Sequence, residues 1–83
     1  MRKIWSDEGC DDYLYWQKQD KRTRDKINKL IKSIERDGAM NGEGHPEVLK
    51  YRPGYSREIN EKDRLVYDIE DGALVIYSCR GHY

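Results

Sequence analysis

Two parts of the sequence carry side chains that can act on a phosphodiester. The stretch GHPEVLK holds Glu47 and Lys50, and the later segments YSREINEKDRLVY and YSCRGHY hold Arg64, His82 and Tyr83. A carboxylate and an imidazole can move protons near neutral pH, and a guanidinium can bind an anion. Taken one at a time, these residue types are also typical of an ordinary polar surface. Their value as a site depends on how the rest of the chain positions them.

The N-terminal part of the chain is predicted to begin with a short β-like segment, RKIW, followed by a helix over DEGCDDYLYWQKQ. Ser6 is a suitable N-cap, and Asp7 and Glu8 suit the positive end of the helix dipole. Gly9 weakens this helix. Its helical spacing is carried by Cys10, Tyr13, Leu14 and Gln17.

A second helix is predicted between Asp20, a suitable N-cap, and Gly38, which stands where a glycine commonly terminates a helix. Its apolar side chains recur at the spacing that puts one stripe on the core. The members of this stripe are Thr23, Ile27, Leu30, Ile31 and Ile34. This is the clearest helix in the sequence.

The second half of the chain is predicted to be loop and sheet. Residues 38–54 are rich in glycine and favour a loop, with a turn of helix near PEVLK because Pro46 suits a first helical position. The segments YSREI, RLVYDI and ALVIYSC predict three strands, and Asp71-Gly72 predicts a type I′ hairpin between the last two. The order β-α-α-β-β-β indicates an α+β fold. We expect one small domain over residues 1–83, with two N-terminal helices packed on one face of a twisted, mainly antiparallel sheet.

Composition sets limits on the function. Of the 83 residues, 36% are apolar and 39% are charged, and no apolar run approaches the roughly 20 residues that cross a bilayer. The start MRKIWSDEG lacks the apolar stretch of a signal peptide, so we expect a cytoplasmic protein with no membrane partner. Cys10 and Cys79 have neither CxxC spacing nor a clustered set of further ligands, so we expect two buried or half-buried thiols, no metal site and no cofactor.

Basic residues are concentrated on the second predicted helix. Residues 18–36 hold eight basic residues against three acidic ones, although the formal net charge of the whole chain is zero. Such segregation can present a phosphate-attracting face, for which Lys26, Lys29 and Lys32 are the candidates. The same pattern is also typical of a solvated helix face.

Four motifs occur in an order that points to a known family: DDYLYW, GHPEVLK, SREINEKDRLVY and the closing CRGHY. Together they resemble the YoeB toxins of the RelE/ParE superfamily, which are bacterial ribosome-dependent mRNA endoribonucleases. The resemblance runs over essentially the whole chain. It implies a microbial-ribonuclease-like sheet whose concave face holds a base, an acid and a cationic clamp.

The same resemblance assigns candidate site residues. The glutamate of the family motif GKPEPLK falls on Glu47, the arginine of HRLVY on Arg64, and the closing HY pair on His82 and Tyr83. Further basic positions near the RNA match Lys50 and Arg57.

The chemistry of RNA cleavage needs these residue types. Attack by the 2′-hydroxyl requires a base, protonation of the leaving 5′-oxygen requires an acid, and the phosphoryl oxygens require positive charge. Glu47 suits the base, and His82 suits the acid because its ordinary pKa is about 6.5. Arg64 suits the phosphate clamp, and Tyr83 can hydrogen-bond or stack on a base. No metal ion is needed.

The sequence departs from the family pattern in four places. Glu58 and His45 stand where the family usually has basic residues, Gly81 stands where it usually has an aromatic residue, and the stretch between Lys50 and Ser56 is about two residues short. The first two changes predict weaker phosphate binding. Gly81 adds backbone freedom before His82.

The resemblance also implies partners. These are a small cognate antitoxin, the ribosome with mRNA in its decoding site, promoter DNA bound through the toxin–antitoxin complex, and a second copy of the chain in a homodimer. Two other functions stay open: a catalytically weakened protein that acts as an antitoxin-bound corepressor, and a ParE-like gyrase poison. The second has no use for an acid–base pair.

Overall fold

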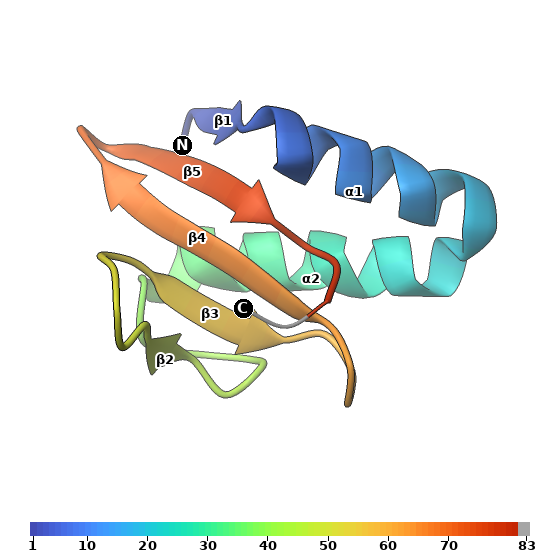
Figure 1. Ribbon diagram of the computed structural model, residues 1–83. Helices are drawn as coiled ribbons and strands as arrows, with labels where there is room; N and C mark the ends of the chain where they lie inside the picture. Colours follow the sequence, from blue (N-terminus) through green and yellow to red (C-terminus); the bar gives the residue numbers. More distant parts are fainter. Residues whose placement is uncertain (82–83) are drawn as a thin grey trace.

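The computed structural model describes residues 1–81, and the predicted acid His82 and its neighbour Tyr83 lie outside the described residues. The chain forms a β-α-α-β-β-β-β sequence of elements (Figure 1). The elements are β1 (Lys3–Trp5), α1 (Asp7–Gln19), α2 (Lys21–Asp37), β2 (Glu47–Val48), β3 (Tyr55–Glu58), β4 (Arg64–Glu70) and β5 (Ala73–Ser78). Within residues 1–81, no helix is long and apolar enough to cross a membrane.

The five strands form one sheet in the order β1-β5-β4-β3-β2. β1 runs parallel to β5, and every other neighbouring pair is antiparallel. The predicted meander of the last three strands and the mainly antiparallel sheet are therefore confirmed. Asp71 and Gly72 form the predicted tight turn, with φ values of 51° and 75° that match the positive values a type I′ turn requires.

The core lies between the sheet and α2, which runs behind the strands in Figure 1. The predicted stripe is confirmed, because Ile27, Leu30, Ile31 and Ile34 are all buried. These side chains pack in one cluster with sheet residues that include Leu65, Tyr67, Leu74 and Ile76. The predicted caps also form: the Asp20 carboxylate accepts from the N–H groups of Arg22 and Thr23, and the Gly38 N–H donates to the Ile34 carbonyl.

α1 approaches β5 at a glycine. A Cβ atom added to Gly9 would lie 2.7 Å from the Ile76 carbonyl oxygen, so Gly9 permits the close contact of helix and strand. The predicted N-cap Ser6 is confirmed, since its Oγ accepts from the Gly9 N–H and donates to the Tyr77 carbonyl. The glycine that weakens the isolated helix is thus required for its packing.

Two predictions of local structure are wrong. PEVLK forms no helical turn: Glu47 and Val48 form the short edge strand β2, paired with Ser56 and Tyr55 of β3. Pairing with β3 outweighs the local preference that Pro46 suggests. Cys10 is exposed rather than buried, whereas Cys79 is buried as expected.

Alternation along β4 separates the core from the site. Leu65 and Tyr67 belong to the core cluster on the helix side of the sheet. Successive side chains of a strand point to opposite faces, so Arg64 and Val66 lie on the other face. We call this helix-free side the open face of the sheet.

Candidate active site

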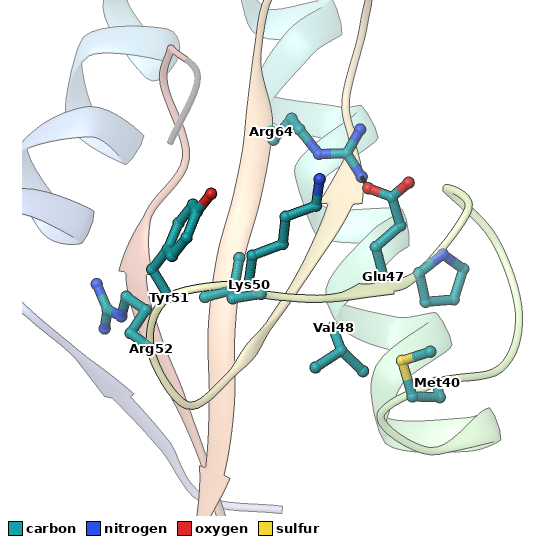
Figure 2. A pocket seen from close by; sticks show the side chains of 9 residues that line it. Met40, Glu47, Val48, Lys50, Tyr51, Arg52 and Arg64 are labelled. Atoms are coloured by element: carbon teal, nitrogen blue, oxygen red, sulfur yellow. Dashed lines mark ion pairs between the residues drawn. The ribbon is translucent and has the colours of Figure 1, made fainter.

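A cleft on the open face brings together the predicted base and the predicted phosphate clamp. It has a volume of about 930 Å³. Figure 2 shows its walls: the loop before β2, β2 itself, the turn that follows, and the first residue of β4. The lining residues are Met40, Pro46, Glu47, Val48, Leu49, Lys50, Tyr51, Arg52 and Arg64.

Glu47 and Arg64 form an ion pair in this cleft, with 3.2 Å between Oε2 of Glu47 and Nη2 of Arg64. Glu47 comes from the edge strand β2 and Arg64 from β4, with β3 between them. The Arg64 side chain is only 12% exposed, whereas that of Glu47 is 58% exposed. The carboxylate is therefore the accessible member of the pair, and the guanidinium forms part of the cleft floor.

Ser56 of β3 orients the guanidinium. Its buried hydroxyl accepts a hydrogen bond from Nε of Arg64 at 3.1 Å. Ser56 is paired with Glu47 on one side and with Val66 on the other, so it lies between the two charged residues. The sequence prediction did not include Ser56, although the alternation in YSRE places it on the face opposite Tyr55 and Arg57.

Lys50 adds a second cation to the cleft. It follows β2 in the β2–β3 loop, whose ends are joined by a hydrogen bond from the Leu49 N–H to the Gly54 carbonyl at 3.0 Å. Figure 2 shows the Lys50 side chain extending toward the end of the cleft where Glu47 and Arg64 meet. The predicted residues Glu47, Lys50 and Arg64 therefore lie around one space. Next to Lys50, the residue Tyr51 is 97% exposed and available to a ligand.

The expectation that Arg57 contacts RNA is wrong. Arg57 points to the helix side of the sheet and has no exposed surface. Its Nε donates to the Tyr67 hydroxyl, and Nη1 donates to the Ser33 hydroxyl. The two Nη groups also donate to the carbonyl oxygens of Gly38, Ala39, Asn41 and Glu43. Arg57 therefore fixes the loop that forms one wall of the cleft.

Tyr67 completes this buried network. Its hydroxyl donates to the Ala39 carbonyl while accepting from Arg57. Burial raises the pKa of Tyr67 above its ordinary value, so the phenol stays protonated and able to donate. The loop between α2 and β2 is thus held by two side chains from the sheet.

The candidate lysines of α2 lie apart from the cleft. Lys29 and Lys32 are exposed, Lys26 is half-buried, and none of the three lines the space around Glu47 and Arg64. Lys29 and Lys32 line a smaller hollow of about 300 Å³ together with Asp25, Asn28, Arg36 and Glu43. Two carboxylates in this hollow partly offset its positive charge.

The chain leading to His82 passes beside the site. The Gly81 N–H donates to Oδ1 of Asp63 at 2.7 Å, and the Gly81 carbonyl accepts from the Arg64 N–H at 3.0 Å. Gly81 has a φ of 83°, which glycine adopts readily. Gly81 is thus hydrogen-bonded at both backbone groups, in contrast to the added freedom expected from the sequence.

Within the described range, no group of three or more His, Cys, Asp or Glu side chains could hold a metal ion.

Comparison with known proteins agrees with this fold. A family model described as the YoeB-like toxin of bacterial type II toxin-antitoxin systems matches residues 5–83. The toxin YoeB of Escherichia coli K12 is 51% identical over 85 residues, with both chains fully covered.

Solved structures give the same result. The YoeB dimer from Staphylococcus aureus matches with a TM-score of 0.94 at 45% identity, covering 100% of this chain and 98% of that one. A chain of the heterotetrameric YoeB-YefM toxin-antitoxin complex from the same organism matches with a TM-score of 0.92, at the same identity and coverage. These matches define the class of the protein, a toxin of a type II toxin-antitoxin system. Within that class, the chain belongs to the YoeB family.

Proposed function

We propose that this toxin is an endoribonuclease that cleaves mRNA on the ribosome by metal-independent acid–base chemistry and thereby inhibits translation. The observation that carries the proposal is the Glu47–Arg64 pair, which places an accessible carboxylate 3.2 Å from a guanidinium inside one cleft. Lys50 and Arg52 line the same cleft, so its positive charge exceeds its negative charge. A cleft of this charge suits a phosphodiester.

In the proposed reaction, Glu47 removes the proton of the 2′-hydroxyl, and the 2′-oxygen attacks the adjacent phosphorus. The bond from phosphorus to the 5′-oxygen breaks, and the leaving oxygen takes a proton, from His82 according to the family resemblance. The products are a 2′,3′-cyclic phosphate and a 5′-hydroxyl. Arg64 and Lys50 stabilise the negative charge that develops on the phosphoryl oxygens.

The proposed partners follow from the family. The S. aureus YoeB-YefM complex supports a small antitoxin as the partner, and we infer that it inhibits the toxin by covering or distorting the cleft. The S. aureus YoeB dimer supports a homodimer. We further infer that the toxin acts in the cytoplasm and that the toxin–antitoxin pair binds its own promoter DNA.

Mapping the 5′ ends of cellular mRNA after brief induction tests the proposal. New 5′-hydroxyl ends within translated regions are expected for the wild type and not for Glu47→Gln, and co-expression of the antitoxin should suppress them. Growth arrest with intact mRNA and a DNA-damage response would instead indicate a gyrase poison. Absence of both arrest and cleavage, with antitoxin binding retained, would indicate a corepressor.

A further inference from the structure

A second hollow on the open face adjoins the cleft. It has a volume of about 400 Å³ and lies over β4, β5 and the start of α1. Arg52 belongs to the walls of both hollows, so the two spaces meet at this side chain. The residues lining the second hollow are Ser6, Glu8, Arg52, Val66, Tyr77, Ser78 and Arg80.

Arg52 lies over an aromatic ring at this junction. Its Cζ atom is 4.4 Å from the centroid of the Tyr77 ring. The ring is held in turn by its hydroxyl, which donates a hydrogen bond to the Glu70 carboxylate. This hydrogen bond is the main cause that raises the pKa of Tyr77, so the phenol remains a donor near neutral pH. Arg52 and Tyr77 thus form a stack, and the hydrogen bond to Glu70 positions the Tyr77 ring.

The stack offers a surface for a flat ligand. Arg52 is exposed, and its guanidinium lies over the Tyr77 ring. Nucleobases stack on arginine guanidinium planes as well as on aromatic rings. Because Tyr77 already orders Arg52, a base that stacks there loses less free energy to immobilising the side chain. At the other end of the hollow, Arg80 forms a similar stack, 3.6 Å from the centroid of the Tyr15 ring.

The charge of the hollow favours a base over a phosphate. Two arginines line it, but Glu8 also lines it, and Glu70 contacts Tyr77. These carboxylates oppose a dianion or a strongly acidic peptide, whereas a neutral planar base tolerates them. Because the hollow adjoins the cleft at Arg52, the next nucleotide of an RNA strand bound in the cleft can reach it.

We propose that Arg52, stacked on Tyr77, binds the base of an mRNA nucleotide neighbouring the scissile bond. The strand then passes from the Glu47–Arg64 cleft across β4 and β5. This inference rests on the proposed ribonuclease function and adds to it a second nucleotide-binding subsite. Arg52 contributes binding there and takes no part in proton transfer.

Single-turnover cleavage of ribosome-bound mRNA tests the proposal. One set of mRNAs carries a single abasic nucleotide at each position near the cleavage site in turn, and intact mRNA is the reference. The proteins are the wild type, Arg52→Ala, Tyr77→Leu and the control Arg2→Ala, which removes an exposed arginine that lines neither hollow. Melting temperatures establish that each variant is folded.

For the wild type and Arg2→Ala, one abasic position should slow cleavage about tenfold, which is the order expected for one lost base stack. Arg52→Ala and Tyr77→Leu should cleave intact mRNA about tenfold more slowly, and the same abasic position should cause no further loss, because the two changes remove one interaction. Equal abasic effects in Arg52→Ala and the wild type would overturn the subsite.

Two other results have distinct meanings. If Arg52→Ala cleaves like the wild type but binds the antitoxin more weakly, the stack belongs to the antitoxin interface and the subsite proposal is wrong. If the wild type leaves intact mRNA uncut on the ribosome, the ribonuclease function itself fails and the subsite falls with it. The wild-type reference therefore separates failure of the function from failure of the subsite.

Discussion

Glu47 and Arg64 are joined across an intervening strand. Oε2 of Glu47 on β2 lies 3.2 Å from Nη2 of Arg64 on β4, and Ser56 on β3 accepts from Nε of the same guanidinium. The two charged residues differ in support: Arg64 begins a seven-residue strand in the sheet interior, whereas Glu47 stands on a two-residue edge strand. Arg64, the proposed phosphate clamp, is therefore rigidly held, whereas Glu47, the proposed base, lies at the accessible edge of the cleft.

This difference predicts that the two residues respond differently to substitution. Glu47→Gln should lower cleavage at least about a hundredfold, as loss of a general base does. The free energy of unfolding should change by only about 1 kcal/mol, because the Glu47 carboxylate is mostly exposed and solvent screens its pairing with Arg64. Arg64→Ala should lower cleavage similarly and also destabilise the fold by about 1–3 kcal/mol, because it removes the hydrogen bond from Arg64 to the buried Ser56 hydroxyl and the packing of a mostly buried side chain.

Urea unfolding and single-turnover cleavage measure the two effects on the same preparations. Glu43→Gln is the matched control, since Glu43 is an exposed carboxylate in the preceding loop and does not line the cleft. Cleavage by Glu47→Gln at the rate of Glu43→Gln would remove Glu47 from the mechanism.

Arg57 should act on stability through the cleft wall. Arg57→Met keeps much of the side-chain volume but leaves the carbonyls of Gly38, Asn41 and Glu43 without their buried donor. Each such loss costs about 1–3 kcal/mol, so a decrease of at least about 3 kcal/mol in the free energy of unfolding is expected. Arg52→Met, at an exposed position, is the control and should unfold near the wild-type urea midpoint.

A phosphate-binding role for Arg57 makes the opposite prediction. Arg57→Met would then unfold at the wild-type urea concentration and lose affinity for RNA. Arg57→Lys separates the contribution of the positive charge from that of the hydrogen bonds, because an ammonium keeps the charge but supplies only three donors without the planar geometry. It should fall between the wild type and Arg57→Met in stability.

The helices and the hairpin were predictable because their signals are local. Asp20, Gly38 and the apolar stripe define α2 within one segment, and Asp71-Gly72 defines the β4–β5 turn without reference to the rest of the chain. The strand β2 was not predictable in this way. It consists of two residues, and it exists because Glu47 and Val48 pair with β3, which overrides the helical preference after Pro46.

The site was predictable only in part, for a similar reason. Motif resemblance located Glu47, Lys50 and Arg64, but it also grouped Arg57 with them. The alternation of Tyr55, Arg57 and Ile59 places Arg57 on the core face, yet an arginine is rarely fully buried unless its charge is satisfied. Its partners are loop carbonyls that converge only when residues 38–43 fold over it, and no local pattern encodes that convergence.

The basic face of α2 is expected to bind rRNA. Lys26→Glu, Lys29→Glu and Lys32→Glu combined should weaken ribosome binding more than antitoxin binding, because these residues lie outside the cleft. The salt dependence of ribosome binding should also become shallower, since fewer phosphate contacts release fewer counterions. Sedimentation with ribosomes over a salt series measures both. Equal effects on the two partners, or no effect on either, would mean that α2 simply presents a solvated face.

The buried thiol of Cys79 should make stability depend on alkaline pH. Burial, followed by the charges of Asp12 and Asp63, raises the pKa of Cys79 from 9.0 to about 12. The unfolded chain therefore loses this proton first, so the stabilisation is fully present below about pH 9 and is lost as the pH rises toward 12. The expected slope is at most about 1.4 kcal/mol per pH unit.

Urea unfolding between pH 8 and 11, in a Cys10→Ser background, gives this slope. The Cys79→Ala variant lacks the thiol, so its free energy of unfolding should depend less steeply on pH. An unchanged slope in Cys79→Ala would assign the alkaline loss to other groups, such as Tyr67, whose pKa is also raised by burial.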